Sequence, residues 1–135
     1  NTRRAIGRRW RKLLRKPLRI LNSTRSVVLG DRVAVADDSR TRRTGLLKHT
    51  SLERGEGLWI APCEAVHTFG MKFVIDVVFL SRKKKVLKIR KNMPKRRVAI
   101  CLRAHSVLEL PAGTLDETGT LAGDELVFGG DFSFA

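Results

Sequence analysis

The sequence predicts a mostly β domain of the α+β class, a compact antiparallel β-barrel-like fold with two short helices and a basic N-terminal extension. Two observations support this prediction. Short apolar segments separated by turn residues recur along the chain, which is typical of barrels and sandwiches. The segment KFVIDVVFL, residues 72–80, is apolar on both faces of a strand. Such a strand belongs in the interior of a sheet that is covered on both sides.

The length of 135 residues suits one domain with a substantial core. We expect a basic amphipathic extension at residues 1–17, a single barrel-like domain at 18–130 and a tail at 131–135. The net charge of +15 indicates an anionic partner. No run of about 18 apolar residues is present, and no signal-peptide pattern follows the basic start. We therefore expect a cytoplasmic protein, with peripheral membrane attachment as an alternative.

The N-terminal segment has the pattern of a basic amphipathic helix up to Pro17. At helical spacing, its apolar side chains gather on one side and its arginines and lysines on the other. The apolar positions are Ile6, Trp10, Leu13, Leu14 and Leu21. This helix could lie on an anionic bilayer, follow phosphates, dock on the domain or stay solvated.

The remaining elements follow from turn and capping residues. We expect strands at residues 18–22, 26–29 and 32–36, with a hairpin or bulge at Gly30-Asp31. Asp37-Asp38-Ser39 predicts the start of a helix over residues 39–48. Further strands are expected at residues 57–62, 64–68, 72–80, 86–89, 98–102, 106–110 and 125–128, with a charged turn at 81–85, a basic loop at 92–97 and a short helix beginning at Thr114.

Asp76 lies in the most apolar part of the central strand. An unpaired charge is costly there, so its carboxyl group is either hydrogen-bonded to backbone amides or a cation, or is neutral with a raised pKa. We favour a structural role, in which this carboxyl group fixes a loop or turn.

Four residues form a weak metal-site pattern. Cys63 and His67 repeat the spacing of Cys101 and His105, and two cysteines with two histidines are enough ligands for tetrahedral zinc. A Cys63–Cys101 disulfide is an alternative, but two reduced thiols are favoured in the cytoplasm. We expect no cofactor.

A catalytic or small-ligand site can be drawn from His67, Asp76 and Glu109, with Cys63 or water as the nucleophile. The chain has no nucleophile elbow, no phosphate-binding glycine loop and no carboxylate pair on one element. Enzyme activity is therefore unsupported by the sequence.

Residues 82–97 carry ten lysines and arginines, the densest basic group in the domain. The predicted binding residues are Arg82, Lys83, Lys84, Lys85, Lys88, Lys95, Arg96 and Arg97. The chain has no tyrosine and only two tryptophans, so base stacking is not expected and binding should depend strongly on salt. The expected partner is a nucleic-acid backbone or an anionic membrane surface; no specific protein partner is indicated.

Two stretches, GLLKHTSLERGEGLWIAPCEAVHTFGMKFVIDVVFL and HSVLELPAGTLDETGTLAGDELVF, resemble the domain of unknown function 192 family, also called uncharacterised protein family 0127. The resemblance covers about residues 18–128 and implies a compact, mostly β, prokaryotic domain with no established activity. The matching positions are Gly45, Leu46, His67, Met71, Asp76, Glu109, Leu110 and Gly113. The lysine-rich turn SRKKK and the basic extension depart from the family pattern, so anion binding would be a local addition.

The sequence thus favours a non-catalytic binding module whose basic extension and residues 82–97 engage an anionic partner. The alternative is a small-ligand or hydrolytic site on His67, Asp76 and Glu109.

Overall fold

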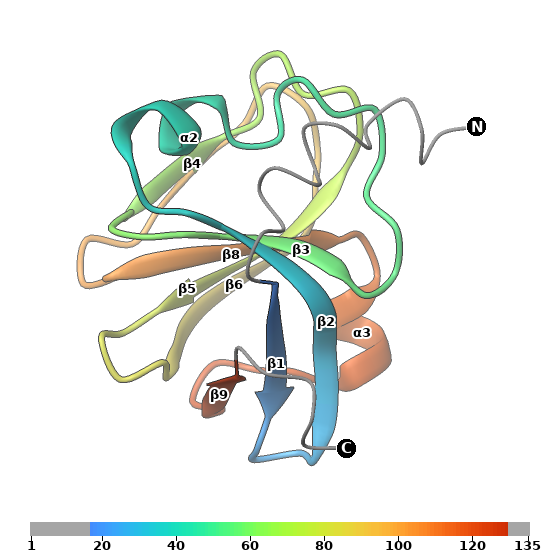
Figure 1. Cartoon of the computed structure of the whole chain (residues 1–135), viewed down its shortest axis with the longest axis vertical. Coiled ribbons are helices and arrows are strands. Elements are labelled where there is room, and N and C mark those ends of the chain that lie inside the picture. The colour runs from blue at the N-terminus through green and yellow to red at the C-terminus, as the bar shows by residue number, and fades with distance from the viewer. Residues whose placement is uncertain (1–16, 130–135) are drawn as a thin grey trace.

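The computed structural model describes residues 17–129, and a curled β-sheet forms its centre (Figure 1). Seven strands form this sheet, and a second sheet has two strands. In spatial order the large sheet contains β6 (Val86–Met93), β5 (Ile75–Leu80), β8 (Ser106–Pro111), β3 (Glu56–Ile60), β2 (Val27–Ala36), β1 (Leu18–Asn22) and β9 (Leu126–Gly129); the small sheet pairs β4 (Ala65–His67) with β7 (Val98–Ile100). Two short helices, α2 (Ser39–Thr44) and α3 (Thr114–Thr118), complete the described part. The predicted mostly β, barrel-like fold with two short helices is confirmed, whereas the predicted N-terminal helix, with Ile6, Trp10, Leu13 and Leu14, lies outside the described residues.

The two edge strands of the large sheet, β6 and β9, meet at one end and almost close it into a barrel. The amide of Val86 donates to the carbonyl of Asp124 at 2.8 Å, and the amide of Leu126 donates to the carbonyl of Lys84 at 3.0 Å. A single bridge pairs Lys85 with Glu125 just before each strand begins. The backbone groups at this end of both edges are thereby satisfied, which protects them from pairing with other chains.

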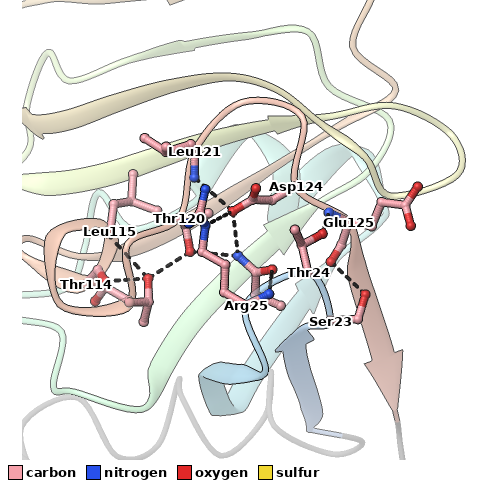
Figure 2. A network of polar contacts seen from close by, with 11 residues as sticks. Ser23, Thr24, Arg25, Thr114, Leu115, Thr120, Leu121, Asp124 and Glu125 are labelled. Atoms are coloured by element: carbon pink, nitrogen blue, oxygen red, sulfur yellow. Dashed lines mark hydrogen bonds and ion pairs between the residues drawn. The ribbon is translucent and has the colours of Figure 1, made fainter.

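A buried polar network fixes the same end of the barrel (Figure 2). The side-chain amide of Asn22 donates to Thr120 Oγ1 at 3.0 Å and to Asp124 Oδ2 at 2.9 Å. Arg25 Nε and the amide of Leu121 donate to the same carboxylate oxygen, at 2.6 and 3.0 Å. Burial alone would raise the pKa of Asp124, but these hydrogen bonds outweigh it and lower that pKa below its ordinary value. The network therefore ties β1 to the loop before β9.

Two local differences from the sequence prediction concern β2, because its two expected strands form one and because it pairs with β3 in parallel. Gly30-Asp31 forms a bulge within one long strand, because Leu18 pairs with Val33 while Ile20 pairs with Gly30. Of the two alternatives expected here, the bulge is therefore confirmed and the hairpin is not formed; the chain reverses at residues 23–26 instead. β2 also pairs with β3 in parallel, although the other pairings of both sheets are antiparallel. The long crossover through α2 makes this pairing possible.

Helix α2 begins where the sequence predicts and ends earlier than expected. The Asp38 carboxylate accepts a hydrogen bond from the amide of Thr41, which is an N-cap contact. The helix ends at Thr44 instead of Lys48 because Gly45 adopts φ 48° and ψ −127°, a conformation available essentially to glycine alone. Leu46 is consequently buried on the turn after the helix.

All six residues of β5 are buried, as expected for an interior strand. Ile75, Val77 and Phe79 pack into one hydrophobic cluster, while Val78 and Leu80 pack into a second. The first cluster lies beneath the β4–β7 sheet and the residues after α2, and the second includes Leu115 of α3. The neighbouring strand β8 follows the same alternation, so the two sides of this sheet have separate environments.

Asp76 has the structural role that the sequence favours. Its Oδ1 atom accepts from the amide of Asn92 at 2.8 Å, and its Oδ2 atom accepts from the amide of Leu115 at 2.9 Å. The fully buried carboxyl group thus fixes the end of β6 and the first turn of α3 onto β5.

Candidate functional site

The candidate site is a pocket of about 80 Å³ between β8, β4 and the residues that follow α2. Its walls combine parts of three separate sequence segments: Gly45 from the first, His67 and Met71 from the second, and Glu109 from the third. The complete lining is Arg42, Arg43, Thr44, Gly45, Leu46, Leu47, Ile60, Cys63, Ala65, Val66, His67, Met71 and Glu109. The three segments are those that carry the family resemblance, so the fold brings its most characteristic residues together here.

A larger hollow of about 430 Å³ lies beside β2 and α3 but is a weaker candidate. The ionisable side chains in it are already paired, Arg54 with Glu117 at 2.7 Å and Arg32 with Asp31 at 3.3 Å. Such exposed pairs form ordinary surface contacts. By contrast, the smaller pocket contains a buried carboxyl group that no described residue pairs with.

That carboxyl group belongs to Glu109, in the middle of β8. Its neighbours across the sheet are Leu58 on β3 and Val77 on β5, and the residue is only 5% exposed. Within residues 17–129, no group donates a hydrogen bond to this carboxyl or forms an ion pair with it. Burial raises its pKa to about 7. Glu109 therefore changes its protonation state near neutral pH inside a pocket.

The turn after α2 forms the wall opposite Glu109. A methyl group built on Gly45 would lie 3.9 Å from Glu109 Oε1, an ordinary contact distance, so the turn borders the carboxyl group and the glycine is needed for its φ of 48° and not for space. Two arginines precede this turn. Arg42 is held by hydrogen bonds to the carbonyls of Asp38 and Pro62, at 3.3 and 3.4 Å. Arg43 is exposed, and no residue of the described chain forms an ion pair with it.

The entrance to β4 supplies the third wall. Cys63 Sγ donates to the carbonyl of Ala65 at 3.1 Å, and burial raises the pKa of its thiol, which keeps it protonated at neutral pH. The side chain of His67 is exposed, and its ring lies 6.0 Å from the ring of Phe69. The buried apolar side chains that line the pocket are Leu46, Ile60, Val66 and Met71.

The structure divides the predicted catalytic trio. His67 and Glu109 both line the pocket, whereas Asp76 does not. Asp76 is paired opposite Leu110, whose side chain packs with the α3 side of the sheet, while Glu109 lies on the other side. Both oxygens of Asp76 are also occupied by backbone amides. Asp76 therefore cannot orient His67 or share a proton with Glu109.

The weak zinc candidates do not form a metal site in the described chain. Among residues 17–129, no three His, Cys, Asp or Glu side chains are grouped closely enough to hold a metal ion. Cys63 and Cys101 are both free thiols, so the disulfide alternative is not realised. His105 lies beside the basic turn, where burial first, and then the charges of Arg82 and Lys84, lower its pKa.

The predicted basic binding residues are divided between the two ends of β6. The turn before this strand carries Arg82, Lys83, Lys84 and Lys85, and the loop after it carries Lys95, Arg96 and Arg97. The eight residues of β6 separate them by roughly 25 Å. Residues 92–97 were expected to form a loop, but strand β6 continues to Met93.

Two of these basic residues contact other segments of the chain, whereas Arg97 donates only to the neighbouring carbonyls of Lys95 and Arg96. Lys84 Nζ lies over the rings of Trp59 and Phe128, at 5.0 and 5.3 Å from their centroids. Lys88 Nζ donates to the carbonyl of Ile100 at 2.8 Å. The remaining six are exposed and have no acidic partner within the described residues.

Sequence reasoning missed the contribution of Gly45 and the two arginines to the pocket. The segment that contains Arg43 and Gly45 and the segment around Glu109 resemble the same family, although they lie far apart in the sequence. This shared resemblance was the signal that could have indicated that the two segments meet.

None of the helices in the described part of the chain has the length and hydrophobicity needed to cross a bilayer.

Comparisons with known proteins agree with this architecture. Residues 20–128 match the model of DUF192, described as an uncharacterised group. The UPF0127 protein of Thermococcus sibiricus is 29% identical over 112 residues, covering 79% of this chain and 72% of the relative.

Two solved structures share the fold. A protein of unknown function from Novosphingobium aromaticivorans has a TM-score of 0.71 at 20% identity, covering 82% of this chain and 83% of that one. A Sinorhizobium meliloti protein, named as a proposed transcription regulator, has a TM-score of 0.73 at 22% identity, covering 84% of this chain and 93% of that one. At these identities the likeness concerns the fold alone.

Proposed function

The chain belongs to the DUF192 family of uncharacterised proteins, and on that premise we propose that it is a non-catalytic binding module for a small molecule, with the Glu109 pocket as its site. One observation carries the proposal: Glu109, a residue that is 5% exposed, lines a pocket, and its carboxyl group receives no hydrogen bond from the described chain. The carboxyl oxygens open into the pocket, where a ligand that donates a hydrogen bond would replace water and offset part of the cost of burying this side chain.

The pocket limits the size and chemistry of the ligand. Its volume of about 80 Å³ equals roughly two to three water molecules, so it accommodates one end of a ligand. The Glu109 carboxyl group would accept a hydrogen bond from a hydroxyl or an amine of the ligand. The apolar wall around Met71 would contact the adjoining carbon atoms of the ligand. Exposed Arg43 would attract a negative group at the mouth. The ligand class that fits is a small amino or hydroxy acid.

The same geometry argues against hydrolysis. The raised pKa of Cys63 leaves it a poor nucleophile. Asp76 lies on the opposite side of the sheet, and no carboxylate of residues 17–129 is hydrogen-bonded to exposed His67. Glu109 could exchange a proton with a bound amine, which would strengthen binding without any chemical step.

An NMR titration tests this proposal. We expect β-alanine and ethanolamine, added to the full chain, to shift the amide resonances of Gly45, Met71 and Glu109. The Glu109→Gln variant keeps the side-chain size and should weaken β-alanine binding at least about tenfold, because a charge-assisted hydrogen bond is lost. An Asp116→Asn variant, changed at an exposed carboxylate that pairs with Lys91, should bind normally. Shifts elsewhere in the chain, or equal binding by Glu109→Gln, would rule the site out.

A second candidate function is binding to an anionic partner. Six exposed cations at the ends of β6 lack acidic partners in the described chain: Arg82, Lys83, Lys85, Lys95, Arg96 and Arg97. We expect binding to polyanions with a log–log salt slope of at least about −4, as several phosphate contacts require. Binding that is unchanged between low and high salt would exclude this function.

A further inference from the structure

We infer that the outer face of the β4–β7 sheet docks on an anionic lipid bilayer, a proposal that rests on the second candidate function and identifies its partner. The strand alternation of β7 buries Ala99 and leaves Val98 and Ile100 about half exposed. Leu102, directly after the strand, is 76% exposed. These aliphatic side chains are exposed, whereas Val66 and Ala99 of the same sheet belong to the hydrophobic cluster beneath it.

The neighbouring strand extends the apolar face. Ala65 pairs with Ile100 and His67 pairs with Val98, and all four side chains point outward. Phe69, beyond the end of β4, is also about half exposed and contacts the His67 ring. A contiguous exposed apolar face on a small domain marks an interaction surface, whereas single exposed apolar residues do not.

Cations border this face. Lys95, Arg96 and Arg97 stand immediately before β7, and Arg103 follows Leu102. All four are exposed, and the segments 64–72 and 94–105 that form this side contain one acid, Glu64. Aliphatic side chains surrounded by lysine and arginine complement a bilayer with anionic headgroups, since the apolar groups enter the interface and the cations remain at its surface.

A nucleic-acid partner fits this face less well. Proteins that bind single strands present aromatic rings for base stacking, and here the exposed row is mainly Val98, Ile100 and Leu102. Phosphate contacts also do not explain why the row is apolar, because such contacts depend on charge alone. The bilayer explains both the aliphatic row and its basic border.

Paramagnetic broadening locates the docking face without any substitution. The full chain is mixed with phosphatidylcholine–phosphatidylglycerol vesicles that carry a headgroup spin label. We expect the amide signals of Val98, Ile100 and Leu102 to broaden more than those of Leu121 and Val127, which are exposed apolar residues elsewhere. Equal broadening at both sets, or broadening that spares β7, would overturn the inference. This readout also distinguishes docking by the domain from attachment through residues 1–16 alone.

Matched variants separate this inference from simple charge binding. The triple change Val98→Thr, Ile100→Thr, Leu102→Ser should weaken vesicle binding at least about tenfold, as expected from the apolar area lost. The control Leu121→Ser, Val127→Thr should change it less than about twofold.

A second pair of variants compares equal changes of charge. Lys95→Glu with Arg96→Glu should weaken vesicle binding more than Lys83→Glu with Lys85→Glu, because the first pair borders the apolar face. Loss of binding in both charge variants without any loss in the apolar triple variant would overturn the docking face and leave the anionic-partner function intact. An absence of binding to the vesicles at low salt, with a DNA oligonucleotide still bound, would overturn the bilayer as partner.

Discussion

Replacing Asp76 with asparagine tests how the central strand is fixed to its neighbours. In the native chain each oxygen of the buried carboxylate accepts one backbone hydrogen bond, from Asn92 at 2.8 Å and from Leu115 at 2.9 Å. Asparagine preserves the size of the side chain, but its amide nitrogen replaces one acceptor with a donor. One of the two backbone amides would then face another donor in a buried place.

The magnitude follows from these two contacts. A hydrogen bond to a charged group contributes about 1.5–3 kcal/mol, and one such bond is lost. The neutral amide is cheaper to bury than a carboxylate, which offsets part of the loss. We therefore expect Asp76→Asn to lower the free energy of unfolding by about 2 kcal/mol. Asp76→Ala removes both acceptors and should cost about 3–5 kcal/mol.

Urea unfolding followed by circular dichroism measures this change. The midpoint should fall with an unchanged m-value, and hydrogen exchange of the Leu115 amide should become faster. Asp116→Asn is the control, because that carboxylate is exposed and its pairing with Lys91 should contribute less than about 1 kcal/mol. An Asp76→Asn variant as stable as the native protein would refute the structural role.

Further predictions concern the pocket wall and the pH dependence of stability. Because burial raises the folded-state pKa of Glu109 to about 7, the folded state binds the proton more tightly, so stability should fall as pH rises from about 4.5 to 7, by about 3 kcal/mol. Glu109→Gln should abolish this decline in urea-unfolding experiments across that range, whereas a native profile in the variant would contradict it. Gly45→Ala should lower the melting temperature, at a cost of about 1–3 kcal/mol, since φ 48° with ψ −127° strains any side chain; an unchanged melting temperature would show that the turn adapts. Asn22→Ala should lower the free energy of unfolding by about 2–3 kcal/mol, because Thr120 and Asp124 lose a buried partner, and a loss below about 0.5 kcal/mol would show that water replaces it. Folding lowers the pKa of the Asp124 carboxyl group, so this group stabilises the fold above its unfolded pKa near 3.8, and the contribution should be lost as the pH falls further. If native chain and Asp124→Asn lose stability in parallel in acid, this contribution of Asp124 is contradicted.

Much of the fold could be predicted because local patterns specify it. The apolar run around Asp76 has no helical period, and its two apolar faces require cover on both sides, which the structure provides. Asp38 likewise marks the start of α2 through its own side chain. The parallel pairing of β2 with β3 could not be predicted, because it depends on where the crossover returns the chain and not on either strand.

The candidate site could be predicted only in part. His67 and Glu109 could be identified from the sequence as titratable candidates. That they line one pocket with Gly45 depends on the packing of three distant segments. Within the described residues no group donates a hydrogen bond to Glu109. This depends on all the residues around the pocket, which come from separate segments of the sequence. The sequence places Asp76 in the same candidate site as a carboxylate that could orient His67. The alternation of each strand, combined with their register, places the two acids on opposite sides of the sheet.

The pKa of Glu109 measured by carbon-detected NMR tests the central claim most directly. With the side-chain carboxyl carbon labelled, we expect its chemical shift to titrate with a midpoint of about 7, and to move to a lower pH when β-alanine is bound, because a bound amine favours the charged carboxylate. A midpoint near the ordinary value of 4.5 would show that water or a protein group already satisfies this carboxyl, and would contradict the proposed site.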